Sequence, residues 1–144
     1  MSSARLGVGI IGCGLIGQKR AKALGAARLV ACADLNLQRA EALASTEAGA
    51  SASADWRNVL ERKDVDIVIV ATTNQALADV SQAAINAGKH VLVEKPAARN
   101  ARELEPVIDA ARQMGIQVRV GFNHRYHPAL RQANNLFKDG LLGK

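Results

Sequence analysis

The stretch GVGIIGCGLIGQKRAKAL, residues 7–24, decides the fold of this chain. Its apolar start predicts a strand over 7–12, and its periodicity predicts a helix over 15–25. Between them lies a G-x-G-x-x-G loop. Gly12 permits a tight turn, Gly14 lets a ligand approach the main chain, and Gly17 lets the helix pack against the strand. The unpaired N–H groups of Gly14, Leu15 and Ile16 at the helix start would then face an anion.

A second apolar run, residues 28–33, ends in Asp34, which lies 22 residues after Gly12. A carboxylate at about this distance binds the adenosine ribose hydroxyls of a dinucleotide, so the two runs together predict a dinucleotide site. The same charge would repel a 2′-phosphate, which favours NAD over NADP. Arg39 could instead pair with such a phosphate, and Asp34 is also a good N-cap for the next helix.

Strand and helix patterns alternate along the rest of the chain and predict an α/β protein with a doubly wound parallel sheet. A helix is expected to start at Asn100 or nearer residue 103, because Pro106 fits poorly inside it, and to end at Met114. Trp56 is expected in the core. The further strands are expected at 50–52, 66–71, 90–93 and 116–121, and the further helices at 37–44, 55–62 and 76–87.

Composition restricts the classes of partner. The chain has 144 residues, 49% of them hydrophobic, and a net charge of +6. Its 19 basic residues are scattered and it has few aromatic side chains, so we expect no nucleic-acid partner. No apolar run is long enough for a bilayer and no signal-peptide pattern is present, so we expect no membrane association and a cytoplasmic location.

The cysteines and histidines give weaker signals. Cys13 and Cys32 are expected as small buried side chains rather than as a disulfide. An exposed Cys13 at the helix start would have a lowered pKa, which leaves a redox-sensing role open. His124 and His127 are three residues apart, but no Cys or carboxylate nearby completes a set of ligands, so no metal site is expected.

Polar side chains follow each predicted strand, as expected for a ligand groove at the carboxyl edge of a parallel sheet. They include Thr72, Asn74, Glu94 and Asn123. Lys95 follows a buried strand, where a lysine could hydrogen-bond a substrate hydroxyl and stabilise the alkoxide formed during hydride transfer. The alternative is an ordinary surface lysine.

The last residues differ from the rest. Pro128 is a good first helical residue, and Leu130, Ala133, Leu136 and Phe137 form one apolar face. Such a face is expected to meet more protein, either a partner chain or a further domain. We therefore divide the chain into a dinucleotide-binding domain, 1–125, and the start of a connection, 126–144. We expect the protein to form a homo-oligomer.

In this order, the glycine loop, the Val93-Glu94-Lys95-Pro96 motif and the segment from Gly121 to Pro128 resemble the N-terminal half of the Gfo/Idh/MocA oxidoreductases. The resemblance implies a Rossmann domain that binds NAD, or less often NADP. It implies hydride transfer between a nicotinamide and a hydroxyl of a sugar, nucleotide sugar or cyclitol. A second domain, absent from this chain, would carry the substrate pocket, so this piece alone is expected to be inactive.

The resemblance also assigns roles. Lys95 corresponds to the catalytic lysine near nicotinamide and substrate, and Asp34 to the ribose-binding acid. Thr72 and Asn74 match a turn that lines the cofactor, while Glu94 and Asn123 match positions near the nicotinamide. A different class of function stays open, a stand-alone nucleotide-binding or redox-sensing module. The presence of Lys95 favours the enzyme, because a module that only binds has no need of it.

Overall fold

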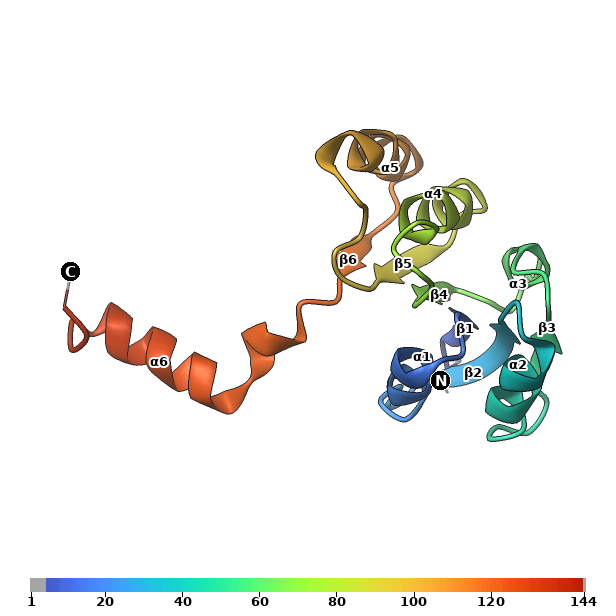
Figure 1. Cartoon of the computed structure of the whole chain (residues 1–144), viewed down its shortest axis with the longest axis horizontal. Coiled ribbons are helices and arrows are strands. Elements are labelled where there is room, and N and C mark those ends of the chain that lie inside the picture. The colour runs from blue at the N-terminus through green and yellow to red at the C-terminus, as the bar shows by residue number, and fades with distance from the viewer. Residues whose placement is uncertain (1–4, 144) are drawn as a thin grey trace.

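The computed structural model describes residues 5–143, and its centre is one six-stranded sheet (Figure 1). All neighbouring strands are parallel and the order is β3-β2-β1-β4-β5-β6. This confirms the expected doubly wound α/β fold. The strands are β1 Gly7–Ile11, β2 Arg28–Ala33, β3 Ser51–Ser53, β4 Ile67–Val70, β5 His90–Val93 and β6 Val118–Val120.

Helices cover both faces of the sheet (Figure 1). They are α1 Leu15–Ala21, α2 Leu37–Ala44, α3 Arg57–Leu60, α4 Leu77–Asn86, α5 Ala101–Met114 and α6 Pro128–Lys138, with a 3₁₀ turn, η1, at Asn123–Tyr126. Helices α1 and α2 pack on one face, and α3, α4 and α5 pack on the other. Strand β4 shows why both faces need cover: Val68 is buried in one cluster and Ile69 in the other.

Helices α3 and α4 are shorter than the expected 55–62 and 76–87, and two other helix boundaries differ for clear local reasons. Helix α1 ends at Ala21 rather than near residue 25, since the Ala23 N–H bonds to Arg20 in a tighter turn and Gly25 adopts a φ of +61°. Helix α5 begins at Ala101, so a start nearer residue 103 is wrong.

A capping box sets the start of α5. Asn100 Oδ1 accepts the Glu103 N–H at 3.2 Å, while Glu103 Oε2 accepts the Arg99 N–H at 2.9 Å. Pro106 is tolerated in the second turn, where it removes only the bond to the carbonyl of Arg102.

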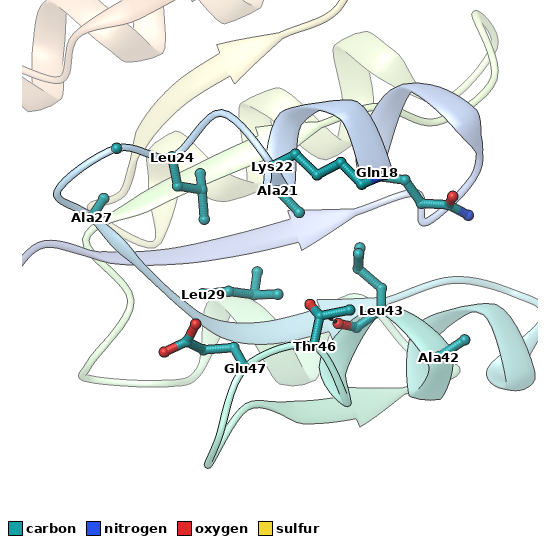
Figure 2. A pocket seen from close by; sticks show the side chains of 11 residues that line it. Gln18, Ala21, Lys22, Leu24, Ala27, Leu29, Ala42, Leu43, Thr46 and Glu47 are labelled. Carbon is teal, nitrogen blue, oxygen red and sulfur yellow. Dashed lines mark hydrogen bonds between the residues drawn. The ribbon is translucent and has the colours of Figure 1, made fainter.

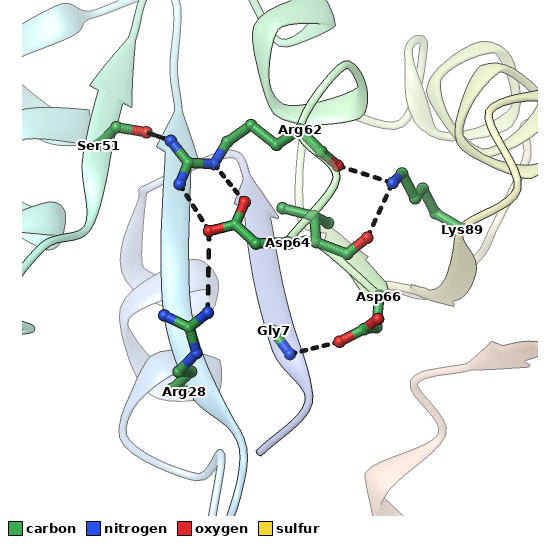
Figure 3. A network of polar contacts seen from close by, with 8 residues as sticks. Gly7, Arg28, Ser51, Arg62, Asp64, Asp66 and Lys89 are labelled. Atoms are coloured by element: carbon green, nitrogen blue, oxygen red, sulfur yellow. Dashed lines mark hydrogen bonds and ion pairs between the residues drawn. The ribbon is translucent and has the colours of Figure 1, made fainter. Parts of the chain in front are cut away.

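A polar network ties together the amino ends of the strands (Figure 3). Arg62 donates to both carboxylate oxygens of Asp64, at 2.8 and 2.7 Å, and to Ser51 Oγ at 3.0 Å. Asp66 Oδ2 accepts the Gly7 N–H at 2.7 Å, and Lys89 donates to the carbonyls of Arg62 and Val65. These bonds fix the edge of the sheet opposite the carboxyl ends of the strands.

The carboxyl edge has a point where the connections diverge. The chain leaves β1 toward β2 and β3 on one side, and it returns to β4, β5 and β6 on the other. Ligands of open α/β sheets bind at such a switch point. The glycine loop after β1 lies at this point.

Helix α6 extends away from the sheet (Figure 1). None of its residues is buried, and Leu130 and Phe137 are exposed. Among residues 5–143, no helix has the length and apolarity needed to cross a membrane.

Candidate functional site

Three glycines of the loop serve different purposes. A Cβ on Gly12 would lie 2.4 Å from the Ala71 carbonyl oxygen, and one on Gly17 would lie 2.0 Å from the Gly12 carbonyl oxygen. Packing within the protein therefore requires both of them. A Cβ on Gly14 would meet no protein atom within 4 Å. The missing side chain at Gly14 leaves an open space at the start of α1, where no side chain caps the helix.

Asp34 lies directly beside this loop. Its Oδ2 accepts the Cys13 N–H at 2.8 Å, and its Oδ1 accepts the Asn36 N–H at 2.9 Å. Asn36, rather than Asp34, caps α2, because its side chain accepts the Gln38 N–H. The N-cap alternative for Asp34 is thus wrong, and the carboxylate is held at the carboxyl edge of the sheet.

A cavity of about 570 Å³ opens between the ends of β1, β2 and β4, and we call it the β1–β2–β4 cavity. Five predicted site or specificity residues line it together: Gly12, Gly14, Asp34, Arg39 and Thr72. The sequence analysis did not assign Leu35, Asn36, Ala54 and Trp56 to a site, although they line this cavity too.

Trp56 corrects an expectation. It is half-buried and packs against the core, but it also lines the cavity, with the Arg57 guanidinium 4.6 Å from the centre of its ring. The sequence could have predicted this position, because an aromatic residue at the start of a short helix after β3 lies at the carboxyl edge of the sheet.

A second cavity, of about 1010 Å³, lies at the ends of β5 and β6, and we call it the β5–β6 cavity. The predicted residues Ile16, Glu94, Lys95 and Asn123 line it. Lys95 is exposed within a turn closed by the Ala97 N–H and the Glu94 carbonyl. Residues of η1 and α6 form the other side: His124, Arg125, Leu130, Arg131, Asn134, Asn135 and Lys138.

Glu94 is the exception among these polar residues because it is buried. Its carboxylate forms an ion pair with Arg20 of α1, and Arg20 Nη2 also donates to Asn123 Oδ1 at 2.8 Å. This contact between α1, β5 and η1 was not predicted. Arg20 lies in a helix whose own pattern gives no sign of a partner so distant in sequence.

Three predicted residues lie outside both cavities, and one of them, Gly17, is buried within the fold. Leu15 and Asn74 are exposed and line neither of them. The main-chain N–H of Leu15 still lies in the first turn of α1, where helix geometry leaves it without an intrahelical acceptor.

Cys13 does not fit the redox-sensing alternative. Both Cys13 and Cys32 are fully buried free thiols, and Cys13 Sγ donates to the Ala33 carbonyl at 3.4 Å. A hydrogen bond to Cys32, together with burial, raises the pKa of Cys13. A raised pKa keeps the thiol protonated and unreactive, which is the opposite of the lowered pKa considered for an exposed Cys13.

A third cavity, of about 590 Å³, lies between α1 and α2 (Figure 2). Gln18 of α1 and Lys22, which directly follows α1, lie across it from Thr46 and Glu47, which follow α2. None of the predicted site residues lines it. Within residues 5–143, no cluster of three or more His, Cys, Asp or Glu side chains could hold a metal ion.

Residues 6–122 match the Gfo/Idh/MocA family, described as an oxidoreductase family with an NAD-binding Rossmann fold. The chain belongs to this family. The match covers the whole sheet and both cavity-lining turns after β4 and β5.

Relatives and solved structures agree with the family. Inositol 2-dehydrogenase of Salmonella typhimurium is 35% identical over 96% of this chain and 43% of its own length. Levoglucosan dehydrogenase of Pseudarthrobacter phenanthrenivorans is 32% identical over 96% of this chain and 38% of its own. KijD10, a 3-ketoreductase of Actinomadura kijaniata crystallised with NADP, has a TM-score of 0.88 and 31% identity over 97% of this chain and 46% of its own.

The chain therefore spans about two fifths of the curated relatives that it matches. As a Gfo/Idh/MocA domain it binds a nicotinamide dinucleotide, and its geometry fits that group. The open space above Gly14 admits a pyrophosphate to the main chain, which a Cβ there would obstruct.

Proposed function

We propose that this chain is the cofactor-binding part of an NAD-dependent oxidoreductase that acts on a hydroxyl of a sugar, nucleotide sugar or cyclitol. One observation carries the proposal. The glycine loop lies between two cavities, with Gly14 lining one and Ile16 lining the other. A molecule made of two nucleosides joined by a pyrophosphate can cross the loop and place one nucleoside in each cavity.

Each residue then has a defined task. The N–H groups of Gly14, Leu15 and Ile16 bind the pyrophosphate, and Asp34 accepts the hydroxyl protons of the adenosine ribose. Thr72 and Asn74, in the turn after β4, contact the cofactor between its two ends. Thr72 lines the β1–β2–β4 cavity, whereas Asn74 lies outside it.

Lys95 is the proposed catalytic residue, since it lines the β5–β6 cavity and is exposed to it. Its ammonium would hydrogen-bond the substrate oxygen and stabilise the negative charge that develops there. The bound nicotinamide supplies or accepts the hydride. Glu94 and Asn123 form the wall of the cavity beside it.

We favour NAD over NADP because the Asp34 carboxylate is held in the cavity by two main-chain N–H groups. A 2′-phosphate placed there would meet a fixed negative charge. Arg39 also lines the cavity and is the residue that could offset this repulsion.

Calorimetric titration of the chain with NAD and with NADP tests the proposal. We expect NAD to bind at least about tenfold more tightly than NADP, which corresponds to about 1.4 kcal/mol. Asp34→Ala weakens NAD binding and reduces that preference, whereas Asp109→Asn, on the outer surface of α5, leaves both unchanged. Absence of NAD binding, or equal affinity for NADP, would contradict the proposal.

We propose further that residues 126–144 begin the connection from the dinucleotide-binding domain, 1–125, to a substrate domain. The exposed apolar residues of α6 and the greater length of the relatives support this division. For the whole protein we propose a cytoplasmic homo-oligomer that binds neither nucleic acid nor membrane. The two free thiols fit a compartment that keeps cysteines reduced.

A further inference from the structure

The buried ion pair of Arg20 and Glu94 lies directly beside the proposed catalytic lysine. Glu94 is only 8% exposed, and burial of an unpaired carboxylate is unfavourable. Arg20 compensates this charge from α1 and uses a second donor to hold Asn123 of η1 at 2.8 Å. One guanidinium therefore joins three elements around the β5–β6 cavity.

The end of β6 is shaped around this pair. A Cβ on Gly121 would lie 2.7 Å from Arg20 Nη2 and 2.9 Å from Glu94 Oε2. Both distances are too short for a real contact, so a side chain at position 121 would displace the guanidinium or the carboxylate. The absence of a side chain at Gly121 therefore leaves the space that the ion pair of Arg20 and Glu94 occupies.

Lys95 is covalently next to Glu94 and lines the same cavity. In the described part of the chain, its ammonium forms no ion pair and no hydrogen bond, although a carboxylate lies one residue away. The other cations that line the cavity, Arg125, Arg131 and Lys138, belong to η1 and α6. Glu94 is the acidic residue in this lining, and Arg20 already neutralises it.

We propose that Arg20 is a positioning residue that acts on Lys95 through Glu94. By holding the Glu94 carboxylate in a buried ion pair, Arg20 keeps it from binding Lys95, so that the lysine ammonium stays available to the substrate oxygen. This inference rests on the proposed function for the role of Lys95. Without Arg20, the Glu94 carboxylate has no compensating charge and pairs with Lys95, which lines the same cavity, so that the lysine is held away from the substrate.

Labelling of lysines with an amine-reactive ester tests this in the 144-residue chain. Mass spectrometry gives the rate at Lys95 relative to exposed Lys63, which lies at the opposite edge of the sheet. In Arg20→Gln we expect the relative rate at Lys95 to fall about threefold, because an ion pair with the Glu94 carboxylate leaves less of the amine free to react. If Arg20 only stabilised the local structure, its removal would loosen the turn that holds Lys95 and would raise the labelling rate at Lys95 instead.

Three further variants test whether the Glu94 carboxylate causes the change in labelling at Lys95. Arg20→Gln combined with Glu94→Gln should return the rate at Lys95 to that of the unmodified sequence, since no anion remains to bind the lysine. Arg20→Lys keeps a cation beside Glu94 and should label like the unmodified sequence. Arg112→Gln, which removes the exposed ion pair with Asp109 on α5, should leave the relative rate at Lys95 unchanged.

If Arg20→Gln does not yield a folded chain, Gly121→Ala tests the same point, because its Cβ lies too close to both Arg20 Nη2 and Glu94 Oε2 for the ion pair to keep its geometry. We expect reduced labelling of Lys95 there as well. An unchanged or raised rate in the folded variant, or a reduction that persists when Glu94 is also changed, would overturn the proposal. NAD affinity, measured separately, reports on the proposed function and not on this result.

Discussion

At the scale of single residues, the glycines at positions 14 and 17 are both part of one motif, yet they are required for different reasons. Gly17 is buried, and any Cβ there would collide with the main chain of the loop. Gly14 has space around it on the protein side. The motif therefore combines a glycine that the fold needs with one whose missing side chain serves the ligand.

Alanine substitutions separate these two roles. Gly14→Ala should change the free energy of unfolding by less than about 1 kcal/mol, since its φ of −72° suits alanine, while weakening NAD binding at least about tenfold. Gly17→Ala should lower the free energy of unfolding by about 2 kcal/mol or more through overpacking. Urea unfolding and calorimetry measure both. Equal loss of stability in the two variants would contradict the distinction.

Trp56 is the one tryptophan of the sequence, and it lines the β1–β2–β4 cavity. Its fluorescence should therefore change when NAD binds, and the change should saturate at the same concentration of NAD as the calorimetric signal. Nicotinamide mononucleotide, which lacks the adenosine, should produce a much smaller change. If calorimetry shows that NAD binds but the fluorescence of Trp56 does not change, the adenosine does not lie in the β1–β2–β4 cavity.

At the scale of elements, the sequence predicts α2, β2 and β5 with their observed bounds, because each has an unambiguous period and clear ends. The end of α1 and the start of α5 were harder to predict. The tighter turn in which the Ala23 N–H bonds to Arg20 ends α1, and the Asn100 capping box outweighs the cost of Pro106. In both cases local hydrogen bonds, which periodicity does not show, decide the boundary.

The candidate site follows the same logic. Asp34 and the glycine loop could be predicted because one motif with fixed spacing joins them. Arg20 could not, since its role depends on a contact between elements distant in sequence. Arg20 lies 74 residues from Glu94, and nothing in the pattern of α1 distinguishes it from a solvated arginine.

The α5 cap makes a prediction at this scale. Asn100→Ala should lower the free energy of unfolding by about 1 kcal/mol, because it leaves the Glu103 N–H without its acceptor. Asn86→Ala, at the exposed end of α4, is the matched control and should be nearly neutral. Urea unfolding of both variants measures the difference, and equal effects would exclude a special role for the cap.

At the scale of the whole molecule, acid should destabilise the fold. Hydrogen bonding to Arg62 lowers the pKa of Asp64, and hydrogen bonding to Arg99 lowers the pKa of Glu103. A carboxyl group with a lowered pKa stabilises the folded state above its unfolded pKa, and this contribution is lost as pH falls through the folded pKa.

We therefore expect Tm to decrease as pH falls from about 6 to about 3. Asp64→Asn should reduce the slope of that decrease, because it removes one of the groups that must be protonated. Both carboxyl groups are partly exposed to solvent, so the effect of each should be modest and should weaken with added salt. A Tm that is independent of pH over this range would contradict the assignment.

The most direct test of the account is a crystal structure of the chain with NAD. The account predicts the pyrophosphate on the N–H groups at the start of α1, above Gly14, with the adenosine ribose on Asp34 and the nicotinamide in the cavity that holds Lys95. A dinucleotide found instead in the cavity between α1 and α2, or one whose ribose makes no contact with Asp34, would contradict it.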